Sequence, residues 1–123
     1  MQALSHLLDR AAYYLDNKNW EGALKLAWIA LEQADGDWAM ASRAHLTLAE
    51  VSLAMGEPVD ALNFTLGAQA TALAAGDTTT QETAHRLQTA IVERWGDWPA
   101  KELAADYERL LSQGGAVTLA GDD

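Results

Sequence analysis

Residues 56–62 read Gly-Glu-Pro-Val-Asp-Ala-Leu, and this short stretch contains a helix stop, a turn and a helix start. Gly56 can take the left-handed conformation that ends a helix, and Pro58 fits the first turn of the next helix, where its missing N–H costs nothing. Matching stretches lie on either side: residues 20–24 read Trp-Glu-Gly-Ala-Leu, and residues 98–103 read Trp-Pro-Ala-Lys-Glu-Leu. Each stretch therefore predicts the point at which a second helix turns back along a first one.

These landmarks recur with a nearly fixed period. Trp20 lies 38 positions before Pro58, and Trp98 lies 40 positions after it. The three histidines of the chain, His6, His45 and His85, are separated by 39 and 40 positions. A fixed period in this range is typical of stacked supersecondary units.

Almost every segment between the turns has helical periodicity. In the first segment, apolar residues fall at positions 4, 7, 8, 11, 12 and 15, which form one stripe on a helix. Similar stripes predict helices over about 20–34, 38–55, 58–76, 79–96 and 98–113, and Thr79 with Glu82 has the spacing of a capping box. No segment alternates with period two, so the sequence predicts an all-α fold of six helices paired as three antiparallel hairpins. We expect one domain over residues 1–113 and a flexible acidic tail over residues 114–123.

Composition narrows the range of functions. Half of the 123 residues are apolar, which suffices for a packed core, and there is no cysteine for a disulfide or a thiolate metal site. Eighteen acids against eight bases give a net charge of −10, which disfavours binding to nucleic acid or to an anionic membrane surface. The sequence shows neither a signal peptide nor an apolar run long enough to span a membrane, so we expect a cytoplasmic protein.

The chain resembles the tetratricopeptide-repeat family. The resemblance depends on the turn glycine Gly56, the Ala61–Leu62 pair and the later small residue Ala68, together with Ala11 and Tyr14 in the first unit. The likeness covers roughly residues 3–112 and is nearest to the longer, degenerate helical repeats of bacterial transcriptional activators and their stand-alone relatives. The family period is about 34 residues, so the longer period here implies longer helices. The resemblance implies a right-handed stack of three hairpins, and a scaffold rather than an enzyme.

The titratable residues give little sign of chemistry. Equivalent histidines in stacked hairpins lie a whole helix pair apart, much farther than a shared metal ion allows, so we expect each to occupy the same inter-helix position. Glu82 and His85 have the Glu-x-x-His spacing of di-iron bundles, but such sites need two copies and further carboxylates. No phosphate-binding loop or nucleophile motif is present. We therefore expect no metal, no cofactor and no catalysis.

The third and fifth helices carry the candidate binding surface. In a tetratricopeptide-like stack the first helix of each hairpin lines the concave face, and an apolar stripe edged by carboxylates suits a basic or amphipathic peptide or helix of a partner protein. Trp38, at a helix start, is a further candidate contact because aromatic residues dominate interface hot spots. The predicted partner-binding residues are Arg43, Leu46, Thr47, Glu50, Leu53, Arg86, Ala90, Glu93 and Trp38.

Two other interpretations stay open. The leucines of this stripe could simply pack on neighbouring helices. The protein could instead associate with itself, as a homodimer for example, by docking its terminal helices, where Tyr13, Tyr14 and Tyr107 lie. A small assembly or secretion chaperone is a special case of the binding module.

Overall fold

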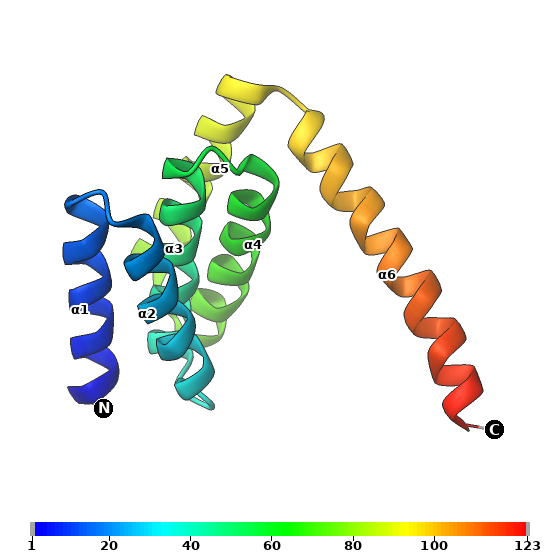
Figure 1. Ribbon diagram of the computed structural model, residues 1–123, viewed down its shortest axis with the longest axis horizontal. Helices are drawn as coiled ribbons and strands as arrows, with labels where there is room; N and C mark the ends of the chain where they lie inside the picture. The colour runs from blue at the N-terminus through cyan, green and yellow to red at the C-terminus, as the bar shows by residue number, and fades with distance from the viewer. Residues whose placement is uncertain (1, 123) are drawn as a thin grey trace.

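A computed structural model of the chain describes the backbone of residues 2–122 and the side chains of residues 4–113. Over residues 2–122 the chain forms six helices and no strand (Figure 1). The helices are α1 (Gln2–Asp16), α2 (Trp20–Gln33), α3 (Trp38–Ala54), α4 (Pro58–Ala75), α5 (Thr78–Trp95) and α6 (Trp98–Asp122). The prediction of an all-α chain is confirmed, and the helices expected at Trp20, Pro58 and Trp98 begin where the sequence places them.

The turns share one backbone feature. Four glycines, at intervals of 20 positions, have positive φ angles of 79° at Gly36, 75° at Gly56, 71° at Gly76 and 68° at Gly96. Glycine tolerates this left-handed region because it has no Cβ atom. The first turn has Lys18 instead, with a φ of 62°, and it is the one described non-glycine residue with positive φ. Each turn therefore ends one helix and begins the next within a few residues.

Polar side chains cap the helices that follow three of these turns. Asn19 accepts a hydrogen bond from the N–H of Gly22, and Asp37 accepts one from Met40. Asp77 accepts bonds from both the N–H and the hydroxyl of Thr80, at 3.0 and 2.6 Å. The predicted capping box at Thr79 and Glu82 is wrong, because Asp77 is the cap and α5 already begins at Thr78.

The core is built largely from alanine, which lets helices approach closely. Three layers stack between α1, α2 and α3, and each layer takes one buried residue from α1, one from α3 and one from α2 or its C-cap, Ala34. The layers are Leu4–Ala34–Ala41, Leu8–Ala30–Ala44 and Ala11–Ala27–Leu48. The numbers rise along α1 and α3 and fall along α2, so α2 runs antiparallel to both of its neighbours.

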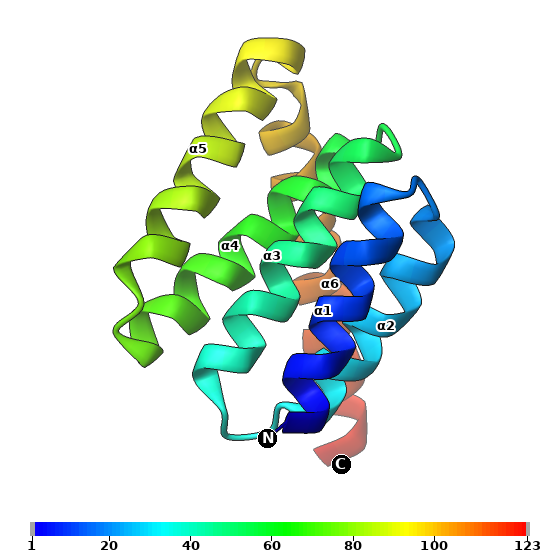
Figure 2. The same ribbon diagram turned by 90° about the vertical axis from the view of Figure 1, so that its left-hand side faces the viewer.

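The helices do not all pair in the same way. α1 packs on α2, α3 packs on α4, and α2 and α4 each also pack on the helix that follows. α6 departs from this pattern: it barely touches α5 and lies mainly against α4. In Figure 1 it leaves the body as a separate arm, and in Figure 2 it lies behind the other helices.

The end of α6 differs from the prediction. The sequence places a helix stop at Gly114–Gly115, but α6 continues through both glycines to Asp122. Glycine lowers helix stability by about 1 kcal/mol per residue without preventing helical angles, so two glycines need not end a helix. The predicted flexibility of residues 114–123 stays a prediction.

The three histidines do not share one environment, contrary to expectation. His6 and His85 are exposed, whereas His45 is partly buried between α3 and α4. A Cβ atom built on Gly67 of α4 would lie only 2.7 Å from the His45 ring, so the ring rests directly on that glycine. Gly67 leaves room for the His45 ring. The residues that follow His6 and His85 at the same distance along the chain are the large side chains Trp28 and Tyr107.

Candidate functional site

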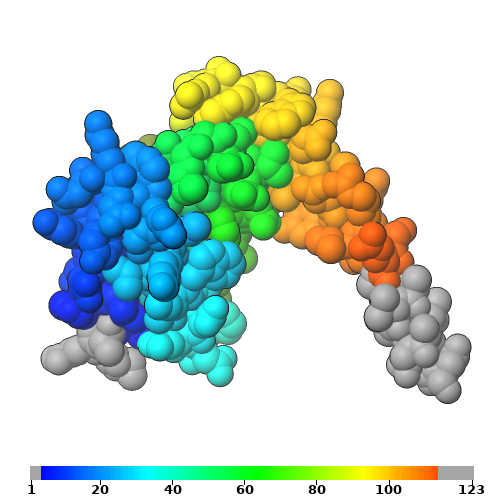
Figure 3. All heavy atoms as spheres, in the orientation of Figure 1, coloured from blue at the N-terminus to red at the C-terminus, as the bar shows by residue number. Residues whose placement is uncertain are grey.

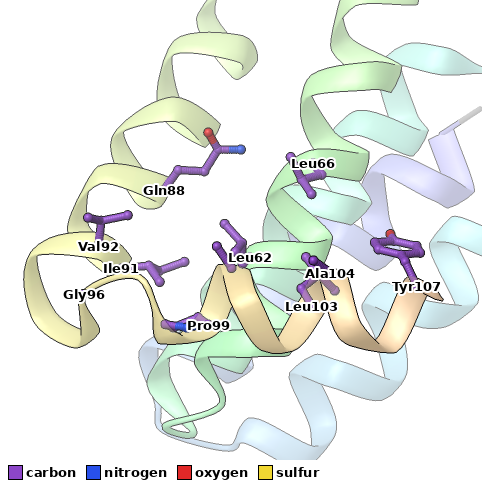
Figure 4. A pocket seen from close by; sticks show the side chains of 11 residues that line it. Leu62, Leu66, Gln88, Ile91, Val92, Gly96, Pro99, Leu103, Ala104 and Tyr107 are labelled. Atoms are coloured by element: carbon purple, nitrogen blue, oxygen red, sulfur yellow. The ribbon is translucent and has the colours of Figure 1, made fainter. Parts of the chain in front are cut away.

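The divergence of α6 from α5 opens an apolar cleft beside α4. Gly96 turns the chain, Pro99 is buried at the start of α6, and α6 then runs away from α5 toward Tyr107. The cleft has a volume of about 410 Å³. Its lining comes from α4, the α5 end and α6, as Figure 4 shows: Leu62, Leu66, Gln88, Ile91, Val92, Gly96, Pro99, Ala100, Leu103, Ala104 and Tyr107.

Two polar side chains of this cleft already donate hydrogen bonds. Gln88 donates to the side chains of Gln69 and Thr65, at 2.9 and 3.2 Å. The Tyr107 hydroxyl donates to the side-chain oxygen of Asn63 at 2.5 Å, and this bond ties α6 to α4. No lining residue carries a charge. The cleft can therefore recognise apolar surface, but it offers no ionic partner to a ligand.

A second hollow continues the first along α4. It has a volume of about 500 Å³ and is lined by Trp28, Leu31, His45, Asn63, Phe64, Leu66, Gly67 and Tyr107. Leu66 and Tyr107 line both hollows, so the two form one depression, here called the α4 groove. The space-filling view shows the open hollow between the body and α6 on this side of the molecule (Figure 3).

Aromatic side chains shape the far end of the α4 groove. Trp28 of α2 meets Phe64 of α4 edge to face, with ring centroids 5.6 Å apart and planes at 76°. Trp28 is 41% exposed and Leu66 is 43% exposed, although both lie on the groove wall. Exposed large apolar side chains around a concave surface are typical of interaction sites.

His45 contributes a neutral ring to the floor of the groove. Its Nδ1 lies 3.0 Å from the carbonyl oxygen of Ala41, one turn earlier in α3. Burial lowers the pKa of His45 below its usual 6.5, and the bond to Ala41 offsets only part of that effect. The imidazole is therefore uncharged at neutral pH, so the whole lining of the α4 groove is uncharged.

The residues predicted from the sequence lie on other surfaces. On α3, Arg43 forms an ion pair with Asp9 of α1 at 3.5 Å, and Thr47 donates to the Arg43 carbonyl. Leu46 and Leu53 are partly buried. Glu50 is exposed as a residue, yet burial of its carboxyl raises its pKa, and Asp16 nearby raises it further.

The predicted α5 residues are more open. Arg86, Ala90 and Glu93 are exposed, and Arg86 donates to the Thr83 hydroxyl at 3.1 Å. Trp38 is 52% exposed at the first turn of α3. None of the nine predicted residues lines the α4 groove. Their role as a binding surface stays a prediction.

The sequence contained one overlooked signal for the groove. Trp28, Gly67 and Tyr107 are separated by 39 and 40 positions, like the histidines, and all three line the second hollow. The period therefore relates groove residues on α2, α4 and α6, just as it relates the three histidines on α1, α3 and α5.

The described residues contain no cluster of metal ligands and no membrane-spanning helix. Among residues with placed side chains, no group of three or more His, Asp or Glu residues is arranged to hold a metal ion. Within the described helices, none combines the length and the apolar character needed to cross a bilayer. Searches for similar proteins found no matching family model, no matching curated protein and no matching solved structure.

Proposed function

We propose that this protein is a non-catalytic interaction module that holds a helix of a protein partner in the α4 groove. The observation that carries the proposal is the groove itself: two adjoining hollows with a mainly apolar, uncharged lining, held open by an arm that departs from its own hairpin. Grooves of this kind accept the apolar face of an amphipathic helix.

A tetratricopeptide-like architecture belongs to the same proposal. The even spacing of the four glycines with positive φ, and the spacing of Trp28, Gly67 and Tyr107, support a right-handed stack of three hairpins in which the third hairpin is splayed. Stacked repeats expose an extended surface on which equivalent positions of successive units line up. In this arrangement the second helices of the units, α2, α4 and α6, supply the groove.

Binding would depend on apolar burial. Apolar area removed from water favours association, and the exposed parts of Trp28, Leu66, Val92 and Tyr107 supply such area along the groove. The groove offers no carboxylate, so it selects an amphipathic helix by its apolar face. Selection of basic residues would need the acids of the other surface, such as Glu50 and Glu93.

Affinity capture with paired baits tests this function. The full chain, Leu66→Glu and Leu73→Glu are immobilised, and proteins retained from the native cell extract are quantified by mass spectrometry. Leu66 lies in the groove, while Leu73 is an exposed leucine of the same helix outside both hollows, so it serves as the matched control. A protein lost with Leu66→Glu and retained with Leu73→Glu supports the proposal. Equal capture by all three baits, or none by any, contradicts it.

A fourth bait separates the two candidate surfaces. Reversing both Glu50 and Glu93 to lysine changes the surface of α3 and α5 and leaves the groove lining untouched. We expect this bait to keep the groove-dependent partner. Loss of the same protein with the charge-reversed bait alone would assign binding to the surface predicted from the sequence.

A further inference from the structure

Helix α6, the arm, carries apolar side chains that the body of the molecule, α1 to α5, does not cover. Leu103 is buried against the body, and Tyr107 reaches α4 through its bond to Asn63. Beyond that contact, Leu110 is 62% exposed and Leu111 is 73% exposed. Leu103, Tyr107 and Leu110 follow the i, i+4, i+7 spacing of one helix face. The face that packs on α4 thus continues along the arm with no partner among the described residues.

We infer that the occupant of the α4 groove is the arm of a second copy of this chain, docked through Tyr107, Leu110 and Leu111. The inference rests on the proposed function and names the partner of the same groove. Because α6 supplies both a wall of the groove and the exposed stripe, one two-fold axis lets each arm fill the other copy's groove at the same time. A two-fold contact of this kind is isologous: the same patch serves both copies and the assembly closes as a dimer.

Charge favours this occupant over a basic peptide. The groove lining carries no charge, so an inserted face must also be uncharged, as the stripe of Tyr107, Leu110 and Leu111 is. The helices on this side are no more acidic than the others: α4, α5 and α6 up to residue 113 carry six acids and four bases, and α1, α2 and α3 carry five acids and three bases, so each set has a net charge of −2.

The available area sets the expected strength. Burying the exposed parts of three arm side chains and an equal area of groove, in both copies, removes on the order of 1,000 Å² from water, at the lower limit for a specific interface. We therefore expect a dimer in concentration-dependent equilibrium with the monomer.

Sedimentation equilibrium on the full chain and three variants tests this, from about 10 μM to about 1 mM, where interfaces of this size associate. Leu111→Glu alters the arm, Leu66→Glu alters the groove, and Leu73→Glu is the control, since Leu73 is 72% exposed and so matches Leu111. A carboxylate forced into an apolar contact is costly, so each of the first two variants should weaken association at least about tenfold. The control should associate like the unaltered chain. Far-UV circular dichroism verifies that each variant is folded.

Mixing the arm variant with the groove variant gives the sharpest result. One copy then has an intact groove and the other an intact arm, so one of the two contacts is restored and the mixture should associate more strongly than either variant alone. A monomer at every concentration overturns the inference, and so does a dimer that either Leu111→Glu or Leu66→Glu leaves unweakened. The bait experiment is independent of this result: a different protein whose capture depends on Leu66 would keep the proposed function and refute the second copy as occupant.

Discussion

The contact between His45 and Gly67 can be tested by one pair of substitutions. In Gly67→Ala, the new Cβ atom would lie 2.7 Å from Cδ2 and 2.8 Å from Nε2 of the ring. Ordinary carbon contacts are about 3.5–4.0 Å, so the ring must retreat by about 1 Å. It cannot do so freely, because Nδ1 is bonded to the Ala41 carbonyl.

Two opposing terms set the magnitude. Overpacking costs about 1–3 kcal/mol, whereas alanine is favoured over glycine in a helix by about 1 kcal/mol. Gly67→Ala alone should therefore lower the free energy of unfolding by about 1 kcal/mol. In a His45→Ala background the obstruction is gone, and the same substitution should raise it by about 1 kcal/mol.

Urea denaturation followed by far-UV circular dichroism measures the four free energies of this double-mutant cycle. We predict a coupling of about 2 kcal/mol between positions 45 and 67. A coupling within about 0.5 kcal/mol of zero would mean that the two residues do not touch, and the packing of α3 on α4 described above would be wrong.

Three further predictions use the turns and the titrating groups. Lys18→Gly should stabilise the protein by up to about 1 kcal/mol in thermal or urea unfolding, since it relieves a left-handed lysine, and no gain would contradict the φ of 62°. Asp77→Ala should cost about 1 kcal/mol, while Asp77→Asn should keep most of the cap. The hydrogen bonds from Thr80 lower the pKa of the Asp77 carboxyl below the usual 3.8, so the free energy of unfolding should fall as the pH drops below that value. Asp77→Asn should remove this part of the acid sensitivity. The lowered pKa of His45 means that the unfolded chain binds more protons near pH 6, so stability should fall as the pH drops through 6.5, and a His45→Gln titration curve as steep as that of the unaltered chain would refute this.

Local features of the fold were predictable because they depend on neighbouring residues. Gly56 and Pro58 encode a stop and a start within three positions, and the turns at Gly36, Gly76 and Gly96 repeat the same logic. The wrong prediction of the cap at the start of α5 was also a local matter. Asp77 and Thr79 both offer an acceptor near the start of α5, and the spacing to Glu82 favoured the wrong one. Only the backbone geometry shows that Asp77 is the cap.

The candidate site was harder to predict because it depends on contacts between distant segments. The stripe of Leu103 and Tyr107 suits packing on α5 as well as on α4, and the sequence contains no rule that decides between them. A regular hairpin was the natural expectation, and it places the binding surface on α3 and α5. Once α6 lies on α4, the groove follows from Leu62, Leu66 and the small residue Gly67.

The same limit explains the histidines. Their equal spacing predicted equal environments, but the environment of a side chain depends on the residue opposite. His45 faces Gly67, whereas the residues at the corresponding distance from His6 and His85 are Trp28 and Tyr107. The period relates the positions of these residues along the chain, but only His45 has a glycine at the corresponding position, and only its ring is partly buried.

The central claim, that the α4 groove holds a helix, is tested most directly by a photoreactive label on a cysteine placed at position 66. The chain contains no other cysteine and Leu66 is 43% exposed, so the label attaches at this one position and reaches whatever occupies the groove. After illumination of the purified chain in the presence of native cell extract, mass spectrometry identifies the linked peptide. We predict links from position 66 to a helical segment of a protein. The main product should be a covalent dimer, separated by mass from the monomer, that is linked to residues 107–113 of the second copy, and the same label at position 73 should give no such link. Links that are absent at 66, or equal at 66 and 73, would contradict the account.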